Sequence, residues 1–158
     1  MSLVFKTSDF GVVASLASWA EPWRGAVSHS VVLSTGVLFV HLAALVCAGG
    51  FSLVADYEIL RRPAGGSSSA LSTQGPRTIA ARALVILLAS GAALFLSDVA
   101  AFADMATFWL KMGLVALLLV NARASISAPA GGRCRLHAWL SVALWAGTLA
   151  LGTMLMSG

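Results

Sequence analysis

The sequence predicts an all-α integral membrane protein: an up-down bundle of four transmembrane helices, with a short N-terminal helix at the membrane interface. The 158-residue chain is 59% hydrophobic and only 10% charged, whereas soluble proteins carry about 25% charged residues. Four of its apolar stretches approach the roughly 20 residues that a membrane-spanning helix needs. Arginines gather in two of the three connections between these stretches. A soluble fold could not cover its surface with so few charges, so lipid must surround most of the chain.

The four predicted spans cover about 31–55, 78–97, 105–122 and 136–156, within a transmembrane domain of residues 28–158. The first span is the strongest, because no Asp, Glu, Lys or Arg occurs from Val31 to Ala55. The second begins near Arg82, whose long side chain can reach the membrane surface. The third contains Lys111, and the fourth has no charged residue. Between the first two, a Gly-, Ser- and Pro-rich stretch over 63–76 predicts a flexible linker, and 128–132 predicts a shorter break.

Residues 1–27 are too short and too polar to span, and they predict a helix lying in the outer interface. Ser8 is a suitable N-cap residue. An apolar side would follow, with tryptophans at the level of the lipid headgroups; its residues are Val12, Val13, Leu16, Trp19 and Trp23.

Loop charges predict the orientation, because cytoplasmic loops carry an excess of Lys and Arg. The short loop after the second span holds only Asp98 and Asp104. The other two connections hold six arginines: Arg61, Arg62, Arg77, Arg123, Arg133 and Arg135. These loops are therefore expected in the cytoplasm, and both termini are expected in the periplasm of a bacterial inner membrane. The net charge of +4 forms no basic stripe, so nucleic acid is not an expected partner.

Small residues within the spans predict close helix packing, because helices in lipid associate where their backbones can approach. The expected contact residues are Ala43, Ala44, Ala48, Gly49 and Gly50 in the first span, Ala89, Ser90, Gly91, Ala92 and Ala93 in the second, and Ala146, Gly147 and Gly152 in the fourth. Apart from the bilayer, a homo-oligomer or a larger membrane complex is a candidate partner.

His41 is the first candidate for chemistry, because it lies about 10 residues, or roughly 15 Å, into the first span. An ionisable residue at this depth is expected to face the bundle. It could ligate a metal or a haem, or relay a proton. The alternative is a histidine that only hydrogen-bonds a neighbouring helix.

Three other polar residues lie within or at the ends of the spans. Lys111 can extend outward towards Asp98 or Asp104, or it can form an anion site or offset a buried charge. Asp56 and the neighbouring Glu58 precede Arg61 and Arg62, which predicts local ion pairs. Asn121 can hydrogen-bond between helices.

Two cofactors, haem and copper, could use these residues. A haem within a helical bundle needs two axial ligands at one depth on different helices. The three histidines do not match in depth, so a haem would need His41 with another ligand or with a second copy of the chain. Copper(I) suits a mixture of imidazole and thioether ligands, and five residues are expected towards the outer face: His29, Met105, Met112, Met154 and Met156. Methionine also fills apolar gaps without any metal.

The spans also resemble a family of uncharacterised bacterial four-helix membrane proteins, distantly akin to the copper-resistance D and cytochrome b561-like membrane proteins. The similarity covers most of residues 36–156, and it is carried by His41, Gly49, Gly50, Asp56 and Leu60, then Gly91, Leu94 and Phe95, then Phe108, Lys111 and Asn121, and lastly Ser141, Leu144, Trp145 and Gly147. The chain departs from the family at Tyr57–Ile59 and at Thr153, where the family has an Arg. The resemblance implies metal or haem chemistry and raises His41, Asp56, Lys111 and Asn121 above the other polar residues.

These observations predict a non-enzymatic inner-membrane protein that binds or helps to move a metal ion, with copper as the first hypothesis. The metal ligands would be His29, His41, Met105, Met112, Met154 and Met156. A b-type haem electron carrier, with His41 as an axial ligand, is the second hypothesis. A membrane scaffold or subunit that only binds another protein is the third.

Overall fold

The computed structural model describes residues 11–61, 70–127 and 132–157, with side chains described for 11–61, 74–124 and 135–153. This part of the chain forms helices and no strand. The six helices are α1 (Gly11–His29), α2 (Val31–Arg61), α3 (Ala70–Ser97), α4 (Val99–Ala103), α5 (Ala106–Ser127) and α6 (Gly132–Ser157). The predicted all-α class is therefore confirmed.

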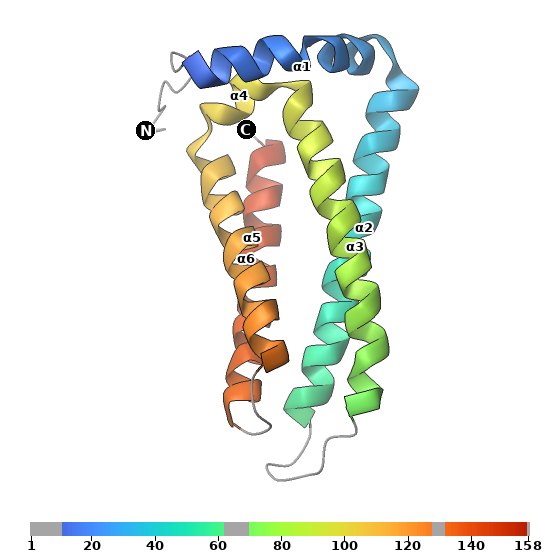
Figure 1. The fold of residues 1–158 in the computed structure, drawn as a ribbon, viewed down its shortest axis with the longest axis vertical. Helices are drawn as coiled ribbons and strands as arrows, with labels where there is room; N and C mark the ends of the chain where they lie inside the picture. The colour runs from blue at the N-terminus through green and yellow to red at the C-terminus, as the bar shows by residue number, and fades with distance from the viewer. Residues whose placement is uncertain (1–10, 62–69, 128–131, 158) are drawn as a thin grey trace.

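Four of these helices are long and apolar enough to cross a membrane: Val31–Arg61, Gln74–Ser97, Ala106–Ala124 and Arg135–Thr153. They run the length of the molecule, and α1 lies across one end of them (Figure 1). We call this end the α1 end and the opposite one the far end. With 31 residues, α2 is about 46 Å long and exceeds the ~30 Å hydrocarbon core of a bilayer. Its termini must therefore reach the headgroup regions.

Two helix boundaries differ from the sequence-based expectation. The helix α3 begins at Ala70 and contains Pro76, so the predicted linker was wrong over 70–76. A proline removes one backbone hydrogen bond without ending this helix. The expected loop at 98–104 contains the short helix α4, whose first turn is capped by Asp98 Oδ1 accepting from the Ala101 N–H at 3.2 Å. Of the predicted break at 128–132, residues 128–131 lie outside the described residues.

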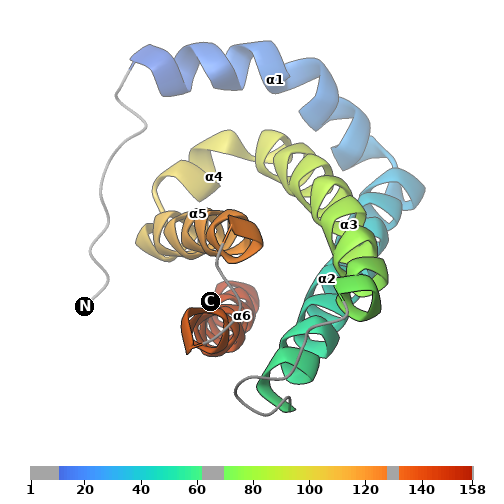
Figure 2. The ribbon, with the colours of Figure 1, turned by 60° about the horizontal axis from the view of Figure 1, so that its bottom comes forward.

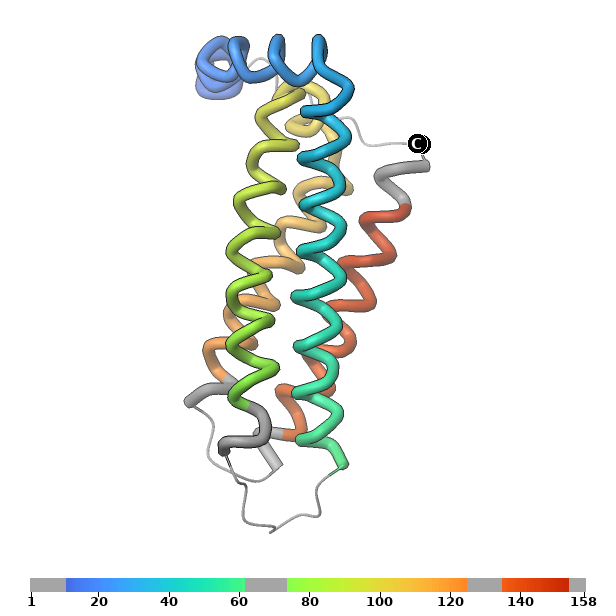
Figure 3. The backbone as a smooth tube through the Cα atoms, turned by 90° about the vertical axis from the view of Figure 1, so that its right-hand side faces the viewer, coloured from blue at the N-terminus to red at the C-terminus, as the bar shows by residue number. Residues whose placement is uncertain are grey.

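The spanning helices pack as two pairs that meet along one contact. The most extensive contact joins α2 to α3, the next joins α5 to α6, and α2 against α6 connects the two pairs. Among the described residues, the backbones of α3 and α5 do not come close to each other. These two helices lie on the more open side of the bundle in Figure 2. Figure 3 shows α2 and α3 side by side along their length.

Small residues form many of the buried contacts, as the sequence predicted. Of the predicted contact residues, Ala44, Ala48 and Gly49 of α2 and Ser90 of α3 are buried. The exposed ones are Ala43, Gly50, Ala89, Ala92 and Ala146. The central cluster adds larger side chains around these small ones: Ala83, Leu87, Leu118, Leu144 and Trp145. Burial therefore follows one face of each helix, while the apolar side chains on the other faces remain outside for lipid.

The helix α1 is attached to the bundle through Trp23. Its indole Nε1–H donates to the Ala93 carbonyl of α3 at 2.8 Å. By contrast, 72% of the Trp19 side chain surface is exposed, as is 78% of Val12. The two tryptophans expected together at the headgroups thus have separate roles, because one rotates towards α3 and the other away from the bundle.

An aromatic cluster closes the α1 end where α3 and α5 diverge. The rings of Phe95 on α3 and Phe108 on α5 stack with centroids 5.1 Å apart. Phe102 of α4 packs at a tilt against both rings, at 6.5 and 5.7 Å. This cluster joins α3, α4 and α5 through side chains rather than through close backbone contact.

Candidate functional site

His41 is held between α2 and α3 by a specific hydrogen bond. Its Nδ1 lies 3.0 Å from Ser90 Oγ. The single hydroxyl proton of Ser90 is directed at backbone carbonyls of its own helix, 2.8 Å from that of Ile86 and 3.1 Å from that of Leu87. When the hydroxyl donates to one of these carbonyls, the Ser90 oxygen accepts from His41, and Nδ1 then carries the ring proton. The lone pair of Nε2 remains for a ligand or another donor.

Gly91 makes space for this imidazole. A Cβ atom at Gly91 would lie only 3.2 Å from His41 Cε1 and 3.7 Å from Nδ1. Any larger side chain would therefore press on the ring or separate the helices. Ser90 of α3 thus supplies a hydrogen-bond partner for the His41 imidazole, and the neighbouring Gly91 leaves the space that the ring occupies.

Lys111 also turns into the bundle. It shares an inward face of α5 with Leu114, Leu118 and Asn121, at spacings of three, seven and ten residues that bring side chains to one side of a helix. Its Nζ lies 3.7 Å from where a Cβ would stand on Gly152 of α6. The sequence left open an outward extension towards Asp98 or Asp104, and the structure instead directs the ammonium towards α6.

The contact of Gly49 with Trp145 sets the relative depth of α2 and α6, because a Cβ on Gly49 would lie 3.4 Å from the indole Cε3. From this level His41 lies eight residues closer to the α1 end, or about 12 Å. Gly152 lies seven residues closer to the same end along α6, or about 10.5 Å. His41 and Lys111 therefore share one depth, and Lys111 is the charged residue that acts electrostatically on the imidazole. We call His41, Ser90 and Lys111 the α1-side polar layer.

A second polar layer lies near the far end. Asn121 of α5 donates from Nδ2 to the His137 carbonyl of α6 at 3.0 Å, and its Oδ1 accepts from His137 Nδ1 at 2.8 Å. The predicted hydrogen bonding of Asn121 between helices is thus confirmed. Ser141 of α6 hydrogen-bonds the Asp56 carboxyl of α2. We call Asp56, Asn121, His137 and Ser141 the far-side polar layer.

Asp56 does not use its carboxyl in the way the sequence predicted. The expected partners were Arg61 and Arg62 on the same helix, of which Arg62 lies outside the described residues. The side chain points instead towards Ser141, and Arg77 at the start of the α3 span is the cation that acts on it. Its Oδ2 is buried and lacks a hydrogen-bond partner among the described residues. Because Asp56 points inward, its carboxylate does not form the predicted ion pair with Arg61.

An apolar section separates the two layers. Asp56 lies seven residues beyond Gly49 towards the far end, or about 10.5 Å, so the layers are about 20 Å apart. The space between them holds the core cluster around Trp145, which is only 3% exposed. The apolar residues of this cluster therefore lie between the two polar layers.

The residues of the copper hypothesis are not gathered in the described part of the molecule. His29 is the exposed last residue of α1, and α1 does not pack against α5. Met105 and Met112 are exposed on 39% and 42% of their surfaces, and Met112 lies outside the inward face that carries Lys111. The side chains of Met154 and Met156 lie outside the described ones. Nor do three His, Cys, Asp or Glu side chains in this part of the chain lie close enough to hold one metal ion.

Sequence reasoning missed the role of Ser90 and the shared depth of His41 and Lys111. Ser90 was expected only as a small packing residue. The depth match has no sequence signal, because the register of α5 and α6 against α2 depends on which side chains meet in the folded bundle. Comparison with known family models, curated proteins and solved structures finds no match to this chain, so the resemblance described above stays a prediction.

Proposed function

We propose that the protein crosses the bacterial inner membrane with the α1 end in the periplasm. The far end carries Arg61, Arg77, Arg123 and Arg135, whereas Asp98 and Asp104 lie at the α1 end. The positive-inside rule assigns such an arginine-rich end to the cytoplasm. On this orientation α1 lies in the outer interface, with exposed Trp19 and Val12 towards lipid and Trp23 attached to α3.

Cysteine labelling is expected to report this orientation. In a chain whose Cys47 and Cys134 are replaced by serine, a cysteine at the exposed position Ala100 should react with a membrane-impermeant maleimide added to intact spheroplasts. A cysteine at the exposed position Ala124 should react only after the membrane is permeabilised. The reverse pattern would assign the α1 end to the cytoplasm and overturn the proposed orientation.

We propose that the α1-side polar layer is the site of a b-type haem and that the protein carries electrons. The observation that supports this function is the shared depth of His41 and Lys111 on two different helices. A haem within a helical bundle takes its two axial ligands in such positions. When bound, the haem supplies reversible one-electron chemistry through its iron.

Each residue of the layer has a defined part in holding the haem. The Nε2 of His41 would bind the haem iron, because the Ser90 hydrogen bond keeps the ring proton on Nδ1. Such a second bond orients a ligating imidazole and raises its basicity. Lys111, as a neutral amine, would be the second residue to bind the iron. The apolar core on the far side would keep water away from the haem, and low local polarity is one of the factors that set a haem potential.

The copper hypothesis receives less support from the same layer. The two described methionines, Met105 and Met112, are exposed rather than turned towards the imidazole. Elemental analysis of the purified protein therefore accompanies the haem test. Copper at one ion per chain without haem would replace the proposal by the copper function. Absence of both cofactors would favour the scaffold or subunit role, including a homo-oligomer or a larger membrane complex.

Replacement of His41 by alanine is expected to abolish haem binding. The unchanged protein, expressed with added haem precursor and purified in detergent, should show a Soret band that shifts on reduction with dithionite. His41→Ala should lose this band, whereas Lys111→Leu should keep haem but give the spectrum of a five-coordinate iron. His29→Ala is the matched control, because His29 lies exposed at the end of α1. A His41→Ala protein with a normal Soret band would contradict the proposed ligand.

A further inference from the structure

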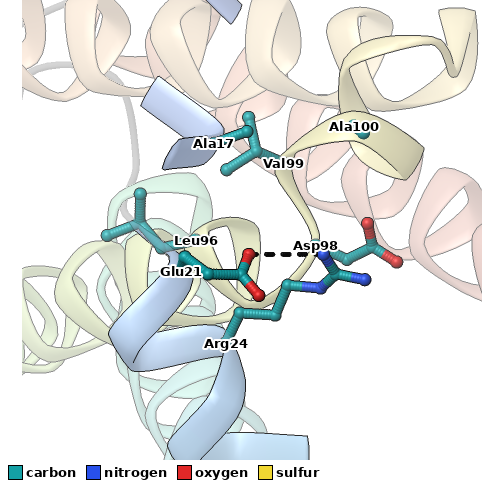
Figure 4. Close-up of a pocket in the computed structure, with 7 residues that line it drawn as sticks. All are labelled: Ala17, Glu21, Arg24, Leu96, Asp98, Val99 and Ala100. Atoms are coloured by element: carbon teal, nitrogen blue, oxygen red, sulfur yellow. Dashed lines mark hydrogen bonds and ion pairs between the residues drawn. The ribbon is translucent and has the colours of Figure 1, made fainter. Parts of the chain in front are cut away.

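A small cavity lies where α1 passes over the turn between α3 and α4. It has a volume of about 80 Å³ and is lined by Ala17, Glu21, Arg24, Leu96, Asp98, Val99 and Ala100. Figure 4 shows Glu21 and Arg24 extending from α1 on one side and Asp98 from the α3–α4 turn on the other. Its lining therefore combines two carboxylates and one guanidinium with small apolar side chains.

The charged groups of this cavity are only loosely engaged with one another. Arg24 Nη1 lies 3.4 Å from Glu21 Oε2, and both side chains are more than half exposed. An exposed ion pair of this length contributes little and exchanges its partner easily. Asp98 uses Oδ1 to accept from the Ala101 N–H. The carboxylates outnumber the guanidinium, so the cavity has a net negative charge beside a single strong anion-binding group.

We propose that this cavity binds the headgroup of an ethanolamine phospholipid, with the phosphate on Arg24 and the ammonium between Glu21 and Asp98. This inference rests on the proposed position of α1 in the membrane interface. A guanidinium matches phosphate through parallel N–H donors. A primary ammonium has three N–H donors and can bond to both carboxylates, as a lysine ammonium does. The charges of the cavity are thus complementary to a zwitterion that carries an ammonium next to its phosphate.

The surroundings fit a lipid rather than a free solute. Trp19 is exposed on the same helix, two residues before Glu21, and exposed tryptophans are typical of the headgroup level. Leu96 and Val99 form the apolar part of the lining. Choline phospholipids have the same phosphate, but their trimethylammonium has no N–H to donate, so the two carboxylates should distinguish between these headgroups.

The test uses the full chain in nanodiscs that contain equal amounts of phosphatidylethanolamine and phosphatidylcholine with identical acyl chains. Lipids that remain bound after transfer to detergent are counted by native mass spectrometry. We expect phosphatidylethanolamine to be retained about tenfold over phosphatidylcholine, which is the ratio expected from hydrogen bonds to charged groups. Glu21→Gln and Asp98→Asn together should remove this preference. Asparagine remains a good N-cap, so the start of α4 should survive the change.

Glu58→Gln is the matched control, because it neutralises a carboxylate near the opposite end of the bundle, and it should leave the preference unchanged. Equal retention of the two lipids by the unchanged protein would overturn the proposal, as would a preference that survives the double substitution. Stronger retention of added phosphatidylglycerol would also overturn it, since that headgroup has no ammonium. The cysteine labelling and the Soret band measure orientation and haem binding separately, so their failure can be distinguished from failure of the lipid site.

Discussion

Gly49→Leu is expected to separate the two helix pairs and to cause a large loss of stability. Gly49 lies at the contact of α2 with α6, where even a Cβ would stand 3.4 Å from Trp145 Cε3 and 3.5 Å from Cζ3. The further carbons of leucine would crowd the indole, which is only 3% exposed, and would enter the small apolar pocket that Gly49 lines with Trp145. Overpacking of a well-filled interior typically costs about 1–3 kcal/mol. Because this contact is the direct link between the two pairs, the whole bundle should be affected.

The free energy of unfolding can be measured by titrating the detergent-solubilised protein with sodium dodecyl sulfate and following tryptophan fluorescence and helical circular dichroism. Gly50→Leu is a closely matched control, because it makes the same change at the next residue, where nothing lies within 4 Å of a new Cβ. Its unfolding midpoint should stay near that of the unchanged protein. An equal loss in both variants would show that helix packing at Trp145 is not the cause.

Gly91→Val is expected to weaken haem binding without altering any proposed ligand. A Cβ at this position would stand 3.2 Å from His41 Cε1, and the two methyl groups of valine would push the ring from its site. The bond between His41 Nδ1 and Ser90 Oγ, now 3.0 Å, should then be lost. Removal of the partner that orients a ligating histidine costs about 10- to 100-fold in affinity, and we expect a loss in this range.

Two measurements distinguish the effect of Gly91→Val on the position of the His41 ring from its effect on haem affinity. Haem titration of the apoprotein, followed at the Soret band, gives the change in affinity. The ¹⁵N chemical shifts of the His41 ring in labelled protein report directly whether Nδ1 still carries its hydrogen bond, with or without haem. Gly113→Val makes the same change in α5, where nothing lies within 4 Å of a new Cβ, and it should leave both readings unchanged. Unaltered His41 shifts in Gly91→Val would contradict the described contact.

The spans and the all-α class were predictable because they depend on composition over short stretches of chain. A run of apolar residues without charges, such as Val31–Ala55, must be helical in lipid, since no water is present to satisfy its backbone groups. The same reasoning identified His41 and Asn121 as polar side chains that contact neighbouring helices, whereas it favoured an outward direction for Lys111. It failed at Ala70–Pro76, where Gly, Ser and Pro indicated a linker although the helix continues through Pro76.

What the sequence determined by itself is therefore the number of spans, the polar residues that lie within them and the arginine-rich connections. Only the tertiary structure decided which of these polar residues meet. His41 reaches Ser90 and shares its depth with Lys111, and Asp56 turns towards Ser141 rather than towards Arg61. The physical reason is that hydropathy is a local property of the chain. The register between helices, in contrast, depends on contacts such as Gly49 with Trp145, which join residues far apart in sequence.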